Sequence, residues 1–173
     1  MVFNSLIVTR LDYCNSLLSG CTKQTLDKLQ RVLNCSVRVI FGGDSCHHVT
    51  LLLCDHLHWL WARECISFKL CILVYKAIHL APCYLKWTVR PSFDFPTLLL
   101  SGNLVVPRTR LQLGNRPFCV AGPVAWNSLP LDIYLAPTLS TFKSMLKTSL
   151  LSFLFRWLTV SQSASSENSI APL

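Results

Sequence analysis

The chain has 173 residues, of which 51% are hydrophobic and 14% are charged, so it is long enough to bury one core but less charged than the roughly 25% typical of a soluble domain. This imbalance predicts apolar surface that a partner covers. Sixteen lysines and arginines against eight acids give a net charge of +8, which favours nucleic acid or an anionic membrane surface as the partner without deciding between them.

The nine cysteines predict buried thiols in a reducing compartment rather than a disulfide framework. Their number is odd, and several occupy apolar positions of expected helices. The first residues lack the basic stretch and the cleavage site of a secretory signal. No apolar stretch is long enough for a transmembrane helix, since the best candidate, 149–160, is short and contains Arg156. We therefore expect an intracellular protein, and the choice between cytoplasm and nucleus stays open.

The pattern of residues 1–90 predicts a helical region. Apolar side chains recur there at helical spacing, and glycines follow the expected helix ends. The helices are expected over 2–18, from Thr22 or Thr25 to Gly42, over 50–57 and over 62–79, with a short turn of helix after Pro82. In 62–79 the residues predicted to face inward are Ile66, Leu70, Leu73, Val74 and Ala77.

Lys28, Arg31 and Arg38 lie on the second of these helices at offsets of three and seven, which places them on one face. Two interpretations remain open for this basic stripe. It is either a solvated surface or a surface that follows phosphates.

A loop is expected over 91–102, and residues 103–158 then predict a β-hairpin followed by helices. The first strand is 104–109, at a sheet edge because Pro107 cannot donate a ladder hydrogen bond. A turn at Gly114-Asn115 leads to a second strand at 118–120. Pro123 then opens a short helix that Pro130 ends.

Ser140 is expected to cap a last helix whose apolar side consists of Phe142, Met145, Leu146, Leu150 and Phe153. The polar composition after Ser161 predicts a disordered tail over 159–173. The fold class is therefore mainly α: a bundle-like set of helices with one small β-hairpin and a disordered C-terminal tail.

Several motifs, in order, resemble the end of a LINE-type reverse transcriptase of the jockey-like, non-LTR group. They are RLDYCNSLLSG (Arg10–Gly20), LDKLQRVLN (Leu26–Asn34), LHWL (Leu57–Leu60), VVPRTR (Val105–Arg110), WNSLP (Trp126–Pro130) and TFKSMLKTSL (Thr141–Leu150). The resemblance covers roughly residues 1–155 and implies the thumb and the region after it, without the catalytic palm. Trp61 and Cys65 depart from the family, which usually has proline and a basic residue there.

Polymerase chemistry requires paired aspartates that hold two divalent ions. The eight acids of this chain are isolated in sequence, and the family's aspartate pair is missing. The sequence therefore predicts no enzyme activity. No nucleophile elbow, phosphate loop or dinucleotide glycine pattern occurs either.

One cluster has the residue types of a zinc site: Cys46, His47, His48, Cys54, His56 and His58. Its spacing does not match a zinc finger, because no CxxC pair opens it and His56 and His58 are two apart. Cys54 fits a buried thiol and His58 a core histidine with a hydrogen-bond partner. We predict neither a metal nor a cofactor.

The expected hairpin contains three arginines, Arg108, Arg110 and Arg116, and no acidic residue lies between them. They predict a patch that contacts phosphates, which Lys143 and Lys147 of the last helix extend. Arg110 or Arg116 could instead pair with Asp132 or with helix carbonyls, because a guanidinium serves carboxylate and phosphate equally well.

Two functions from different classes follow from these residues. The first is a non-catalytic remnant of a retrotransposon reverse transcriptase that binds RNA or DNA weakly and without sequence preference. The alternative is a small, domesticated helical module that binds another protein through exposed apolar surface, or a relic without a selected function.

Overall fold

The computed structural model describes residues 9–10, 12–13, 15–42, 49–80 and 103–167. In these ranges the chain is mainly helical, as predicted, and contains no β-strand. The elements are η1 (Asn15–Leu18), α2 (Lys23–Ile40), α3 (Val49–Leu51), the π-helical turn η2 (Leu52–His56), α4 (Ala62–His79), η3 (Gln112–Asn115), α6 (Phe118–Asn127), α7 (Leu131–Tyr134) and α8 (Leu139–Glu167). None of the helices described is both long enough and apolar enough to cross a membrane.

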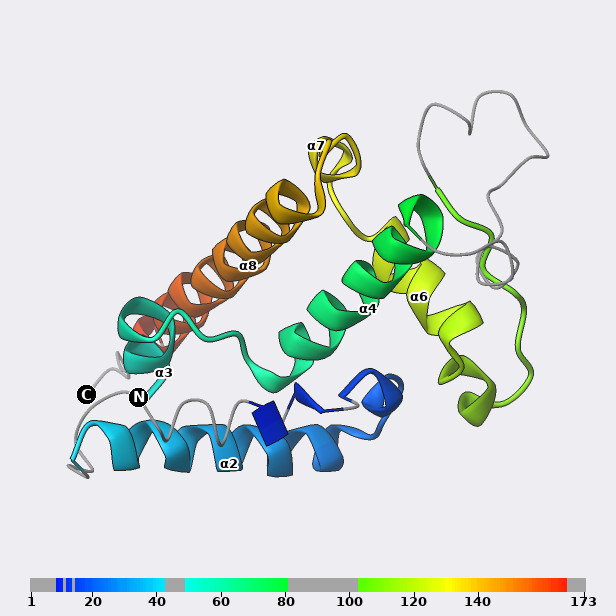
Figure 1. The fold of residues 1–173 in the computed structure, drawn as a ribbon. Helices are drawn as coiled ribbons and strands as arrows, with labels where there is room; N and C mark the ends of the chain where they lie inside the picture. Colours follow the sequence, from blue (N-terminus) through cyan, green and yellow to red (C-terminus); the bar gives the residue numbers. More distant parts are fainter. Residues whose placement is uncertain (1–8, 11, 14, 43–48, 81–102, 168–173) are drawn as a thin grey trace.

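Helix α4 lies at the centre of the molecule and packs against η1, α2, α6 and α8 (Figure 1). Its bounds are those that the sequence predicts. Four of the five side chains predicted to face inward are buried, whereas Leu73 is 37% exposed and that prediction is wrong. Because neighbours cover α4 on several sides, Cys71, Ile72 and Tyr75 are buried as well. A prediction that only one face of a helix is buried therefore names too few buried residues when the helix lies at the centre of the fold.

Helix α2 also follows its sequence signals. Thr22 is its N-cap residue, and Gly42 adopts a φ of +82° directly after the C-cap Phe41. This left-handed backbone favours glycine because a side chain would be strained there. Leu33 and Val37 are buried against η2 and the start of α4. The predicted helix over 2–18 is described only in part, since its first seven positions lie outside the described residues.

The C-terminal core is built around Phe142 of α8. Its ring stacks on Tyr75 of α4 at a centroid distance of 4.4 Å and on Trp126 of α6 at 5.7 Å. The Tyr75 hydroxyl donates a hydrogen bond of 3.1 Å to the carbonyl of Ala136. Three helices and the connection before α8 thus meet at one aromatic side chain.

The predicted β-hairpin is wrong. Residues 118–120 form the first turn of α6 rather than a strand, and the amides of Val120 and Ala121 both donate to the carbonyl of Pro117 at 3.0 Å. Pro117 has the fixed φ that suits a helix start and needs no hydrogen-bond partner for its nitrogen. Gly114 and Asn115 lie in the turn η3 without positive φ. Pro123, expected to open the helix, lies inside it.

Leu104, predicted to begin the first strand, is held by a side chain instead of a strand. Its amide donates to Asn127 Oδ1, and its carbonyl accepts from Asn127 Nδ2, both at 2.8 Å. The carboxamide of Asn127 therefore satisfies both backbone groups of Leu104, as a neighbouring strand would. This contact, the Leu104–Asn127 clamp, joins the motifs around Val105 and Trp126.

Helix α8 extends further than predicted, through Glu167, so residues 159–167 are helical rather than a disordered tail. The stretch contains no glycine or proline, and a helix that is already formed propagates at little cost through alanine, serine and glutamate. Thr138, not Ser140, caps α8, since its hydroxyl accepts from the Thr141 amide at 3.2 Å. Phe153 is exposed, and Leu154 takes the buried position predicted for it.

The expected turn of helix after Pro82 and the expected loop over 91–102 lie outside the described residues, as do positions 168–173.

A candidate phosphate-binding groove

Arg108, Arg110 and Arg116 are all exposed, on the extended segment before η3 and just after it. Lys69 and Asp12 form an ion pair at 3.1 Å, in which none of these arginines takes part. The predicted pairing of Arg110 or Arg116 with Asp132 does not occur, and none of the three exposed guanidinium groups has a carboxylate of the described residues within 4.0 Å.

Arg108 lies at a groove of about 690 Å³ that we call the α4–α6 groove. Its walls include the turn over 18–21, one face of α4, the segment 106–109 and one side of α6. Figure 1 shows α4 and α6 packed side by side, with the connection to η3 running past them. The floor is apolar, and the charged groups stand at the rim.

Arg63 is a second arginine in the lining of this groove, and the sequence analysis missed it. It lies in the first turn of α4 and is exposed. Arg63, Ser67 and Leu70 share one face of α4 at offsets of four and seven, and all three line the groove. That spacing was visible in the sequence, but nothing there indicated that the face would meet the segment carrying Arg108.

The backbone around Arg108 is fixed on both sides. The Leu104–Asn127 clamp holds the segment on its N-terminal side. On the other side, the Thr109 hydroxyl forms a hydrogen bond with Asn115 Oδ1. A Cβ on Gly114 would lie 3.1 Å from the Thr109 Cβ, so this turn is tightly closed. Arg108 therefore projects from a positioned loop rather than from a free one.

Arg116 lies beside the groove, and its aliphatic stem contacts the turn after η1. The Arg116 Cγ is 3.4 Å from the point where a Cβ of Gly20 would lie. Gly20 itself has a φ of +68°, a conformation that favours glycine. The stem is thus packed while the guanidinium remains at the surface.

The other predicted cations do not join the groove. Lys28, Arg31 and Arg38 are exposed on the outer face of α2, as their spacing predicts. Lys143 and Lys147 are exposed on α8, and Lys147 lines a different cavity, between α4 and α8. The structure therefore brings together Arg63 and Arg108, with Arg116 next to them, and separates the rest.

Two thiols of the neighbouring α4, Cys65 and Cys71, are not activated nucleophiles. Burial, aided by the negative charges of Asp12 and Glu64, raises the pKa of Cys65 to about 12. Burial alone raises the pKa of Cys71 to about 12. Glu64, in the first turn of α4, also has a raised pKa because it is buried. These shifts favour the neutral forms, and an activated thiol would show the opposite shift.

The candidate zinc cluster is described only in part, since Cys46, His47 and His48 lie outside the described residues. Cys54 is fully buried, and the His58 Nδ1 lies 2.9 Å from the Cys54 carbonyl oxygen. His58 thus has its predicted hydrogen-bond partner but lies at the surface rather than in the core. Within the described ranges, no three histidine, cysteine or acidic residues are placed to hold a metal ion.

No protein family, curated protein or solved structure matched this chain.

Proposed function

We propose that the α4–α6 groove binds the sugar-phosphate backbone of RNA or DNA without sequence preference. The observation that carries this proposal is that Arg63 and Arg108, far apart in sequence, line one groove and have no carboxylate of the described residues within 4.0 Å. Arginine presents a planar fork that matches phosphate oxygens, and a protein with excess positive charge attracts polyanions over a distance.

The chemistry of the groove suits a nucleic-acid strand. Its charged groups lie at the rim, where a backbone would pass, and its floor is apolar. The described residues of the lining include no acid that would repel phosphate. Contacts of this kind fix the position of a strand but carry no sequence information, because they do not reach base edges.

The resemblance of the sequence motifs to LINE-type reverse transcriptases supports the same proposal. In such a chain, a helical region beyond the palm would hold template and product without taking part in the chemistry. We accordingly propose a non-catalytic role. Purified protein should not extend a primer in the presence of magnesium or manganese, because the paired aspartates of the family are absent from the sequence.

The test is a fluorescence titration of labelled single-stranded and duplex oligonucleotides between about 50 and 200 mM salt. Each lost phosphate contact should reduce the slope of log K against log salt by about 0.7 for a single strand and 0.9 for a duplex. Replacing both Arg63 and Arg108 with alanine should therefore lower the single-strand slope by about 1.4, with similar losses for unrelated sequences.

Lys76→Ala is the matched control. Lys76 is exposed on α4 like Arg63 but does not line the groove. Its removal lowers the net charge by one without touching the site, so the slope should change less than in Arg63→Ala. If a folded double arginine variant keeps the full slope, the groove does not bind phosphate. Binding to another protein with an affinity that does not change with salt concentration would favour the protein-binding alternative.

A further inference from the structure

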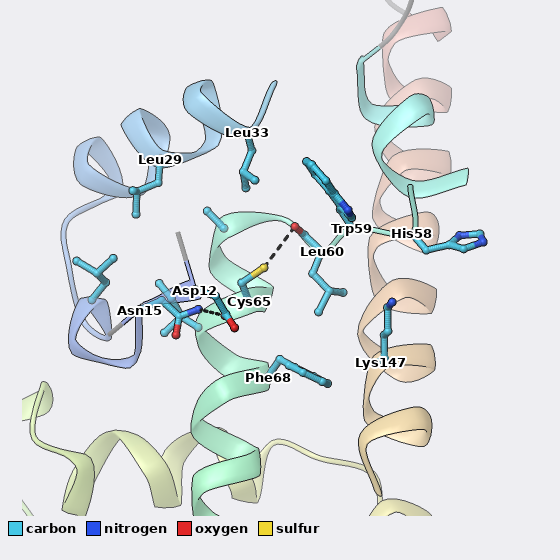
Figure 2. A pocket seen from close by; sticks show the side chains of 13 residues that line it. Asp12, Asn15, Leu29, Leu33, His58, Trp59, Leu60, Cys65, Phe68 and Lys147 are labelled. Carbon is cyan, nitrogen blue, oxygen red and sulfur yellow. Dashed lines mark hydrogen bonds between the residues drawn. The ribbon is translucent and has the colours of Figure 1, made fainter. Parts of the chain in front are cut away.

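A second cavity, of about 260 Å³, lies between η1, α2, α4 and α8 (Figure 2). Most of its wall is apolar, with Leu29 and Leu33 on one side and Leu60 and Phe68 toward α8. A single water molecule requires roughly 10–15 Å³ of such volume, so the cavity has room for a small organic molecule. An apolar wall of this kind favours an apolar occupant over a cluster of waters.

One polar side chain of the wall is buried without a full set of partners. Asn15 is 2% exposed, and its Nδ2 donates to Asp12 Oδ1 at 2.9 Å. The other amide atom, Oδ1, is buried and has no hydrogen-bond partner. Leaving a buried acceptor unpaired costs about 1–3 kcal/mol, so this atom favours a ligand that brings an O–H or N–H group to it.

The opposite side of the cavity carries a positive charge. Figure 2 shows Lys147 projecting from α8, across the cavity from Asp12 and Asn15. No carboxylate of the described residues lies within 4.0 Å of its ammonium group, and the nearby Asp12 pairs with Lys69 instead. An acidic group at this end of the cavity would therefore meet a cation that is not already neutralised.

We propose that this cavity binds a small amphiphile with three features: an apolar body, a hydrogen-bond donor that meets Asn15 Oδ1, and an acidic group that meets Lys147. Leu18 and Ile66 line both this cavity and the α4–α6 groove, but the lining cations differ: Lys147 here, Arg63 and Arg108 in the groove. Binding is non-covalent, because the one thiol in the wall, Cys65, is protonated at neutral pH and its Sγ contacts the Leu60 carbonyl at 3.5 Å.

The probe is 1-anilinonaphthalene-8-sulfonate, which has an aromatic body, one N–H and one sulfonate. Saturable binding of one molecule per chain is expected, with brighter fluorescence and a higher Tm. Lys147→Met should weaken this binding at least fivefold. Lys143→Met is the matched control: Lys143 lies one turn earlier on α8, is also exposed and does not line the cavity, so affinity should stay within twofold.

Two further experiments test the contacts of the ligand's apolar body and of its hydrogen-bond donor. Leu29→Trp fills the cavity and should abolish binding, whereas Val32→Trp adds the same ring on an exposed position of α2 and should not. The N-methylated probe lacks the donor and should bind at least threefold more weakly. Circular dichroism confirms that each variant is folded, and Leu33→Trp replaces Leu29→Trp if that variant unfolds.

Several results would overturn the proposal. They are binding of many probe molecules per chain, equal losses in Lys143→Met and Lys147→Met, or full binding in a folded variant whose cavity is filled. Arg63→Ala with Arg108→Ala should leave probe binding unchanged. Failure of nucleic-acid binding and failure of the amphiphile site are therefore separate outcomes.

Discussion

At the scale of single residues, burial controls the chemistry of the thiols. Cys54 and Cys71 are buried in the core as the sequence predicts, whereas Cys35 is exposed on α2. All of the cysteines described are free of disulfide bonds. Both buried thiols pack as small apolar side chains, and burial opposes the ionisation of Cys71.

The raised pKa of Cys71 predicts a loss of stability at alkaline pH. In the unfolded chain this thiol ionises near 9.0, whereas in the folded protein its pKa is about 12. The folded state thus holds a proton that the unfolded state has lost. Stability is fully present below pH 9 and should fall between pH 9 and 12, by up to about 1.4 kcal/mol per pH unit for this group.

Cys71→Val removes that titration while keeping the side chain apolar. Urea unfolding of the variant between pH 9 and 11 should show a shallower decline of the free energy of unfolding than in the unaltered protein. Cys35→Ser, at an exposed position, should follow the unaltered curve. Parallel curves for Cys71→Val and the unaltered protein would show that this thiol does not resist ionisation.

At the scale of elements, α4 and α6 approach each other closely at Gly122. A Cβ built there would lie 3.0 Å from Val74 Cγ2 and 3.1 Å from the Phe118 ring. Both neighbours belong to packed parts of the core, so neither can move without disturbing others. The glycine is required by this approach of two helices rather than by its backbone conformation.

Gly122→Ala should therefore destabilise the protein. Alanine favours a helix over glycine by up to about 1 kcal/mol, but overpacking a tight core costs about 1–3 kcal/mol, so the net loss should be about 1 kcal/mol. Thermal or urea unfolding measures it. In the background of Val74→Ala, where the opposing methyl group is gone, the same change should cost less or become favourable. Equal costs in the two backgrounds would contradict the contact.

The elements also show why part of the fold was predictable. α2 and α4 have regular apolar spacing and clear ends at Thr22, Gly42 and His79, which are local signals. Only the second half of α6 was predicted as helix, because the valines, prolines and glycine around its first half have weak helical preference and its formation depends on packing against α4. The Leu104–Asn127 clamp is a contact between a side chain and a distant backbone, which no local pattern encodes.

At the scale of the whole molecule, the candidate site was predicted in part. Arg108, Arg110 and Arg116 stood out because they are concentrated in one segment without acids. Arg63 did not, because its relevance depends on how α4 packs beside that segment. Lys143 and Lys147 were assigned to the same patch on charge alone, whereas Lys147 lines a different cavity, between α4 and α8.

The low charge of the chain has a structural counterpart in large apolar side chains at the surface. Tyr13 is 80% exposed, Leu17 71% and Leu135 81%. We expect the isolated chain to self-associate through such side chains. Because the contacts are apolar, sedimentation should show association that persists or strengthens from low to high salt, opposite to nucleic-acid binding.

Replacing Tyr13 and Leu17 with serine should shift this association toward the monomer, since the two lie on the same short stretch of the surface. Leu135→Ser, made alone, tests whether a second exposed position contributes to the association. A protein that sediments as a monomer at every salt concentration, before any replacement, would show that these exposed side chains do not associate.

The Leu104–Asn127 clamp has a consequence for the rate at which backbone protons are replaced by deuterium. The Leu104 amide is bonded to a carboxamide, and its residue is 6% exposed, whereas Val105 and Val106 beside it are each 40% exposed. The Leu104 amide proton should therefore exchange slowly, while the amide protons of Val105 and Val106 exchange fast. Its exchange rate reports how often the segment carrying Arg108 separates from α6, without any ligand present.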